Sequence, residues 1–285
     1  MRQLLLLAAA LGLSACGSVA AATTPNRAKL PLGDGKCSSS PKSGYIYSCQ
    51  QSYSSNAPGS KVNGPWIDTT SGTWDMTQKI SVAGSVKRSN VHKVKVAAGT
   101  LTVTGNGLPA VSGTFPVSSG DPAYQYDRNP NTIAGYALSI SVPANPTVAS
   151  NTTCAGGMIG VTIKGIPIFN GFDAGARDAQ AHEVQDSCGG HPQERGVYHY
   201  HGLSKCYSRK GLYGYALDGF GIYGPVDQQT GRTLSTKDLD ACHGITSTVR
   251  WHGRWVRMYH YVATDDFPYT VGCFRGTPNQ SAGRL

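Results

Sequence analysis

Several features that the sequence lacks exclude whole classes of protein. No apolar run reaches the about 18 residues that a transmembrane helix needs, so we expect no membrane-spanning segment. Charged residues make up only 14% of the chain, and its 36 glycines and 15 tyrosines favour a turn-rich β protein over a helical one. No G-x-S-x-G, Ser-Lys or phosphate-loop motif occurs, which leaves serine-hydrolase and nucleotide chemistry without support.

The basic residues are scattered. The formal net charge is +9, yet no basic stripe with interleaved aromatics is present, so we expect no nucleic-acid partner. A mild attraction to anionic polymers or lipid headgroups follows from the charge. The expected partners are an anionic envelope polymer or another protein.

The N-terminus predicts export. Arg2 and the apolar run from Leu4 to Leu13 have the charge and length of a signal peptide. Residues 13–17, Leu-Ser-Ala-Cys-Gly, resemble the lipobox of bacterial lipoproteins, which implies cleavage before Cys16 and lipidation of that cysteine. The alternative is an ordinary signal peptide cut near residues 20–22. The expected location is the bacterial outer membrane, or otherwise the periplasm or cell surface, with the membrane contacted only through the lipid anchor.

Export implies an oxidising compartment, in which cysteines first suggest disulfides. Beside Cys16 the chain has seven cysteines and no C-x-x-C, so metal-thiolate sites are disfavoured and one cysteine is left over. Cys37 and Cys49 are close enough in sequence to pair and to pin an N-terminal loop. Cys154 is the expected odd one out.

The first half of the chain predicts a scaffold. Residues 1–16 form the expected signal peptide, and residues 17–60, rich in Ser, Thr, Pro, Gly and Asn, predict a flexible tether followed by the pinned loop. Residues 61–150 predict a β region without chemistry of its own. Its expected strands are 79–86, 91–96, 101–104, 114–117 and 136–142.

The second half contains an internal repeat. Residues 160–173 align without a gap on residues 214–227, an offset of 54 positions (160 to 214). At the same offset Asp186-x-Cys188 falls on Asp240-x-Cys242, and after a longer loop Tyr198-His-Tyr has a partner in Tyr259-His-Tyr. We expect two units, 159–206 and 213–273, each with two strands joined by a glycine turn, an Asp-x-Cys turn, a Tyr-His-Tyr strand and a closing cysteine.

The repeat predicts disulfides and architecture. The symmetric pairs are Cys188–Cys206 and Cys242–Cys273, each enclosing a Tyr-His-Tyr strand. The expected fold is mainly β: an antiparallel β-sandwich-like domain containing the tandem repeat, stapled by disulfides. Few short helices are expected, near residues 173–185 and 235–240.

Histidines concentrate in this half, where seven of the eight lie. His199 and His201 alternate with tyrosines, so on a strand their side chains share one face about 7 Å apart. Neutral imidazoles at this spacing suit zinc or copper. If the units pack about a pseudo-twofold axis, His260 reaches the same site. Candidates for extra ligands or supporting residues are His191, His243, Asp218 and His182.

These motifs resemble the YHYH-domain family of exported proteins. The resemblance rests on Tyr198-His-Tyr-His201, the Asp186-Ser-Cys-Gly-Gly-His191 turn and the segments around residues 217–224, 239–244 and 267–273. It covers about residues 151–276, with residues 277–285 as a tail, and implies metal binding through the signature histidines. The second copy has Val262 where the first has His201, which favours one asymmetric site over two.

Three functions are compatible with these features. The first is an exported, lipid-anchored envelope protein that binds copper or zinc through the histidines. The second is a metal-dependent hydrolase or oxidase with an open metal position. The third is a surface interaction module whose histidines are structural. Four protein ligands in a closed site favour the first, and three ligands in a cleft favour the second.

Overall fold

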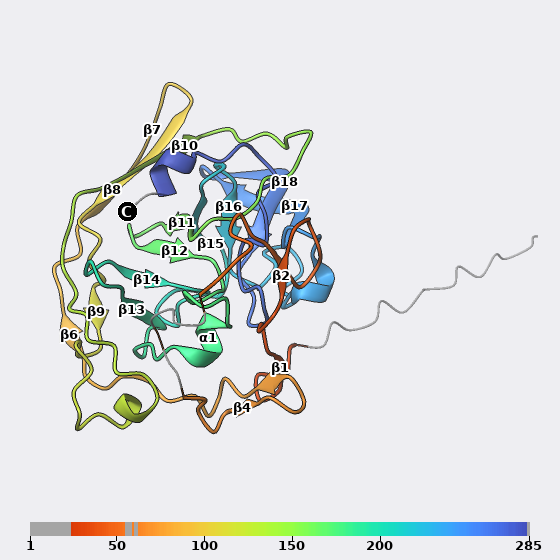
Figure 1. Cartoon of the computed structure of the whole chain (residues 1–285). Coiled ribbons are helices and arrows are strands. Elements are labelled where there is room, and N and C mark those ends of the chain that lie inside the picture. The colour runs from red at the N-terminus through yellow and green to blue at the C-terminus, as the bar shows by residue number, and fades with distance from the viewer. Residues whose placement is uncertain (1–23, 55–58, 60–61, 284–285) are drawn as a thin grey trace, which may run out of the picture.

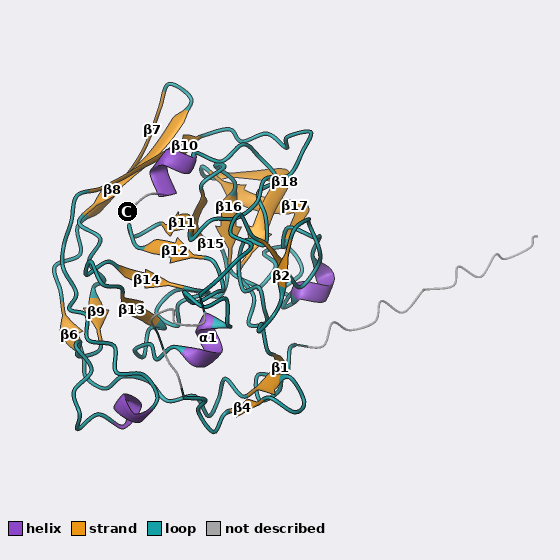
Figure 2. Cartoon of the chain, viewed as in Figure 1, coloured by secondary structure: helices purple, strands orange, loops and turns teal. Residues whose placement is uncertain are grey.

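A computed structural model describes residues 24–54, 59 and 62–283 (Figure 1). The expected signal peptide, with Cys16, lies outside the described residues. Strands and loops dominate the rest (Figure 2), so the expected mainly β class is confirmed. No helix among the described residues is both long and apolar enough to cross a membrane.

One eight-stranded sheet carries the repeat. Its spatial order is β13 (Gly190–Pro192), β14 (Tyr198–Tyr200), β12 (Pro167–Phe169), β11 (Met158–Thr162), β15 (Leu212–Ala216), β16 (Gly221–Tyr223), β18 (Arg254–Val262) and β17 (Gly244–Trp251). The first four strands come from one repeat unit and the last four from the other. β11 and β15 pair antiparallel at the centre, and the strands outside them follow in mirrored order. The units are therefore related by a pseudo-twofold axis between β11 and β15.

Each unit follows the same local path. In both, the Tyr-His-Tyr strand (β14 or β18) pairs parallel with the short strand on its inner side (β12 or β16), and the remaining pairs are antiparallel. Gly165 and Gly219, at equivalent positions, turn the chain between the first two strands with φ of 71° and 90°. Only glycine adopts such angles without steric cost, which explains why the turn repeats in the sequence.

The first half of the chain adds smaller sheets. They are β10 (Leu138–Pro143), β8 (Thr100–Gly105) and β7 (His92–Ala97); β1 (Leu30–Pro31), β5 (Thr73–Trp74) and β4 (Ile67–Asp68); β2 (Cys37–Ser38) with β3 (Ile46–Tyr47); and β6 (Val86–Lys87) with β9 (Val111–Ser112). Three of the five strands expected here are present. Residues 79–86 hold only an isolated bridge and the start of β6, and residues 114–117 contain a cis Phe115-Pro116 bond instead of a strand.

The large sheet and the smaller ones share one core. Leu101, Val103 and Ile140 belong to the same buried cluster as Ile159 and Ile222 of the large sheet. Residues 62–150 therefore bury their apolar side against the repeat, and this packing positions the loops around the first unit.

Helical turns are few and short. α1 (Ala179–His182) and the 3₁₀ turn η2 (Thr236–Asp238) lie in the two segments predicted to contain them, and η1 (Pro122–Gln125) and η3 (Gln280–Gly283) are the others described. The Asp178 side chain caps α1 by accepting from the Ala181 amide.

Three disulfides staple the fold. Cys188–Cys206 and Cys242–Cys273 form as the repeat predicts. The expected pairing of Cys37 with Cys49 is wrong: Cys49 bonds Cys154, and Cys37 is a free thiol.

The reason is the local strand pairing. β2 sets Cys37 opposite Ile46, whereas the Cys49 amide donates to the Ala155 carbonyl and so brings Cys49 beside Cys154. A short separation in sequence did not decide the partner, because the chain between the two cysteines loops round and returns as β3, parallel to β2, with Ile46 and not Cys49 opposite Cys37.

Candidate metal centre

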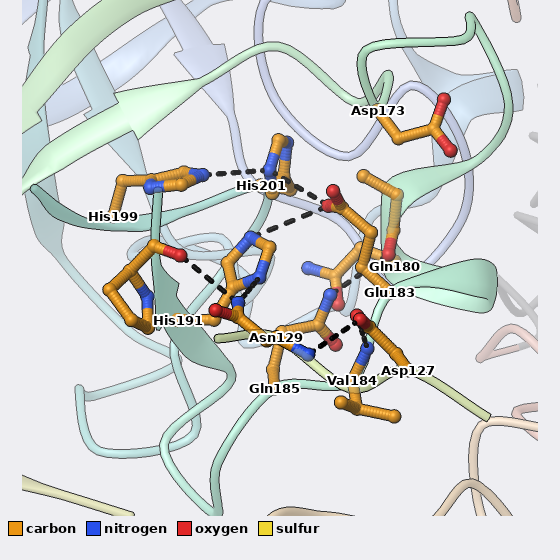
Figure 3. Close-up of polar contacts among 12 residues, drawn as sticks. Asp127, Asn129, Asp173, Gln180, Glu183, Val184, Gln185, His191, His199 and His201 are labelled. Carbon is orange, nitrogen blue, oxygen red and sulfur yellow. Dashed lines mark hydrogen bonds and ion pairs between the residues drawn. The ribbon is translucent and has the colours of Figure 1, made fainter. Parts of the chain in front are cut away.

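Three histidines of the first repeat unit converge at the edge of the large sheet (Figure 3). β13 and β14 pair antiparallel with His191 opposite His199, and His201 follows two positions along the chain. The i, i+2 spacing puts His199 and His201 on one face. One nitrogen from each of the three rings lies within 4.8 Å of the others, and all three residues are 3–4% exposed.

The Nδ1 atoms of two rings are occupied by backbone carbonyls. His199 Nδ1 lies 3.1 Å from the Val197 oxygen, and His201 Nδ1 lies 2.6 Å from the Asn170 oxygen. A carbonyl only accepts, so each Nδ1 must carry the proton and each Nε2 must present a lone pair. This is the arrangement in which metal-bound imidazoles are usually held.

The two Nε2 atoms face each other at 3.0 Å. Two lone pairs at that distance repel unless they share an electropositive partner, either a proton or a metal ion. Two ligand atoms about 2.0–2.1 Å from one tetrahedral metal lie roughly 3.3 Å apart. The separation in this cluster is therefore close to that of a ligand pair.

Glu183 completes the cluster. It directly follows α1, and its Oε2 lies 3.4 Å from His191 Nε2 and 3.3 Å from His201 Nε2. Both Oε2 of Glu183 and Nε2 of His191 are buried without a hydrogen-bond partner by geometric criteria. Buried polar atoms are rarely left unpaired, so these two atoms point to a missing ligand.

Burial sets the protonation of the cluster. It lowers the pKa of His199 to about 3 and of His201 to about 4, and it holds the pKa of His191 well below its usual value. The rings are thus neutral at physiological pH, the form that binds metal. Burial, and then the nearby Asp173 and Asp127, raise the pKa of Glu183, so a cation is what would stabilise its carboxylate.

The surroundings close the site. The Phe169 ring stacks on His199 at 4.1 Å between centroids. Behind Glu183, the Lys79 ammonium donates to the backbone oxygens of Gln180 and Glu183. A cavity of about 320 Å³ lies nearby, yet neither Glu183 nor any of the three histidines lines it.

The predicted third ligand is elsewhere. His260 stands on β18, and four strands separate β14 from β18 in the sheet. At about 4.8 Å per strand the two sites are more than 20 Å apart, because the pseudo-twofold axis sends the units to opposite ends. His260 instead packs its ring against Tyr223, and its place in the cluster is taken by His191, predicted only as an extra ligand or supporting residue.

The other predicted supporting residues have structural contacts of their own. His182 pairs with Asp34, with Nε2 2.9 Å from the carboxylate. Asp218 accepts from the Tyr261 hydroxyl and the Gly276 amide, and His243 lies 3.0 Å from the Thr264 hydroxyl. None of them belongs to the three-histidine cluster.

Glu183 is the residue that the sequence analysis missed. The neighbouring His182 was predicted as a candidate, and Glu183 was not. α1 ends at His182, so the next residue turns toward β14 while His182 faces Asp34. The feature of the sequence that could have indicated this ligand is an acidic residue directly after a short, buried helical turn.

The fold and cluster together define a disulfide-stapled β protein with a buried three-histidine, one-carboxylate site. Residues 139–234, about a third of the chain, match the family model described as YHYH protein. The match includes all four residues of the site but ends before β17 and β18. No curated protein and no solved structure matches the chain.

Proposed function

We propose that this chain is an exported, lipid-anchored envelope protein that holds a transition metal, copper or zinc, at His191, His199, His201 and Glu183. The observation that carries the proposal is the convergence of unprotonated Nε2 atoms on the unpaired Glu183 Oε2. A set of neutral imidazoles with one carboxylate suits either metal.

Binding without turnover fits the site better than catalysis. Catalytic zinc sites keep one position open for water or substrate, whereas structural sites are closed by four protein ligands. Here four side chains are available, the three histidines are 3–4% exposed, and the nearby cavity does not reach them. A hydrolase or oxidase would require Glu183 to move away from the metal.

Export is supported by the cysteines. Six of the eight form disulfides, which persist in oxidising compartments such as the periplasm or cell surface. The lipid anchor at Cys16 rests on the lipobox resemblance alone. Radiolabelled palmitate incorporation into wild type and Cys16→Ser tests it: equal labelling would exclude the anchor.

The metal site is tested by elemental analysis of untagged protein. We expect about one equivalent of zinc or copper in wild type and almost none in His199→Ala/His201→Ala, because two of four ligands are gone. Glu183→Gln, which keeps shape but loses charge, should weaken binding about tenfold or more.

His260→Ala is the matched control. It removes a buried histidine at the equivalent position of the second unit and should leave the metal content unchanged. Equal metal in wild type and in the double variant would overturn the proposal, as would loss of metal in His260→Ala with the fold intact by circular dichroism.

A further inference from the structure

The cavity beside the metal centre has its own charge pattern. Its volume of about 320 Å³ is at the lower end for small-molecule sites. Four basic side chains and two acidic ones line it: Arg27, Lys79, Lys205, Arg209, Asp186 and Asp265. The three cations other than Lys79 outnumber the two carboxylates by one, and Lys79, whose pKa burial lowers to about 7, adds a partial positive charge.

Both acidic residues already have partners within the protein. Asp265 receives both guanidinium nitrogens of Arg209 at 2.9 Å. Asp186 accepts from the Tyr198 hydroxyl and from backbone amides, including that of Gly113. Beyond these contacts, the two carboxylates offer the remaining cations only a long contact of 3.7 Å between Asp265 and Arg27.

Two lysines lack a counter-ion. Within the described part of the chain, no carboxylate lies within 4.0 Å of the ammonium of Lys79 or Lys205. Lys79 donates to three neutral oxygens, those of Gln180, Glu183 and the Gln185 side chain, so its three donors are used. Burial lowers the pKa of Lys79 to about 7, so this ammonium is only partly charged at neutral pH. Lys205 is exposed, so its ammonium is available to an anion that enters the cavity.

The basic side chains and the apolar residues that line the cavity indicate which kind of ligand it can bind. Lys205 and Arg27 lie at this cavity, and the Arg27 guanidinium makes only a long, 3.7 Å contact to Asp265 and a contact to the Met76 sulfur. Trp74 and Leu203 provide apolar walls.

We propose that this cavity binds a small organic anion, with its carboxylate or phosphate group against Lys205 and Arg27 and its apolar part along Trp74 and Leu203. The site shares no lining residue with the metal cluster, so it does not depend on metal being bound.

Isothermal titration calorimetry of the full-length protein at low ionic strength tests this with benzoate, phenyl phosphate and neutral benzyl alcohol. We expect saturable one-to-one binding of at least one anion, and the better of the two identifies the preferred headgroup. Lys205→Gln and Arg27→Gln should each weaken binding about tenfold, the loss of one charge-assisted hydrogen bond.

Arg254→Gln is the control, since it removes an exposed cation at the β17–β18 turn, outside the cavity lining. It should change the affinity less than twofold. His199→Ala/His201→Ala should bind the anion as wild type does, which separates this proposal from the metal site. Absence of saturable binding, equal binding of benzyl alcohol, or equal weakening by Arg254→Gln would each overturn it.

Discussion

The first repeat unit (159–206) and the second (213–273) build the same turn around an aspartate. Asp186 accepts from the Tyr198 hydroxyl and the amides of residues 188 and 190, and Asp240 accepts from the Tyr259 hydroxyl and the amides of residues 242 and 244. His199 and His260 also match, since Nδ1 of each faces the carbonyl two residues earlier. The scaffold is therefore conserved between the two units.

The units differ where the cluster lies. Strand pairing puts Ile245 opposite His260 as His191 lies opposite His199, Val262 stands at the position of His201, and Lys237 falls at the offset of Glu183. Ile245 and Val262 pack in a small apolar cluster with two leucines. Since aliphatic side chains stand at the places of His191 and His201 in the second unit, the shared scaffold does not require histidine at these two positions.

Grafting the cluster onto the second unit gives the largest expected effect. Ile245→His/Val262→His with Lys237→Glu adds the three missing ligands to His260, whose ring is already oriented like that of His199. We expect the metal content to rise from about one to about two equivalents by elemental analysis.

The same graft in a His260→Ala background is its control. That protein should return to one equivalent, because the second site then lacks a ligand. Two equivalents in both backgrounds, or one in both with the fold intact, would show that equivalent backbone positions do not suffice to make the site.

The next comparison between the units is the loss of stability when one disulfide is removed at a time. In the chain-entropy picture, Cys188→Ser/Cys206→Ser, which opens a loop of 18 residues, should cost about 3 kcal/mol, and Cys242→Ser/Cys273→Ser, with 31 residues, about 4 kcal/mol. Urea unfolding measures both.

Metal content should follow the opposite order. The first bridge encloses β14 and its histidines, so its loss should lower metal occupancy, whereas loss of the second should not. Equal metal loss in both variants would mean that the bridges act on the site only through overall stability.

The two units also differ at one turn position in how their stability should depend on pH. His243 occupies the place of Gly189, with φ of 70° against 84°. Burial lowers the pKa of His243 to about 3, so between about pH 6.5 and 3 the unfolded chain binds a proton that the folded chain does not. Stability therefore falls as the pH drops through this window.

His243→Gly introduces the residue of the first unit and removes that titration. We expect a flatter fall of unfolding free energy between pH 6.5 and 4, even if the lost packing lowers stability at every pH. Metal-free protein is used, so that the cluster histidines contribute equally to both curves. Parallel pH curves would contradict this assignment.

Much of this comparison could be predicted from the sequence, because two segments with the same motifs at the same spacing are expected to fold in the same way. The equal offset of the Gly165 and Gly219 turns predicted two matching hairpins, and the cysteines around each Tyr-His-Tyr strand predicted two bridges. The alternation at 198–201 predicted the shared face of His199 and His201.

The third and fourth ligands could not be derived in the same way. The position of His260 depends on which strands meet at the pseudo-twofold axis, and the sequence does not reveal that β11 and β15 meet there and not the Tyr-His-Tyr strands. Glu183 depends on where a four-residue helix ends. Both are properties of tertiary packing, which overrides local pattern.

The tyrosines that start the two Tyr-His-Tyr strands should show the smallest difference between the units. Tyr198→Phe and Tyr259→Phe each delete one hydroxyl that donates to the turn aspartate. Asp186 is 1% exposed, whereas the Asp240 side chain is 39% exposed and water can replace the lost donor there. We expect Tyr198→Phe to cost about 1–3 kcal/mol and Tyr259→Phe less than about 1 kcal/mol by urea unfolding. A larger cost for Tyr259→Phe would mean that burial of the aspartate does not govern the strength of this contact, and that the two turns are held by different interactions despite their matching hydrogen bonds.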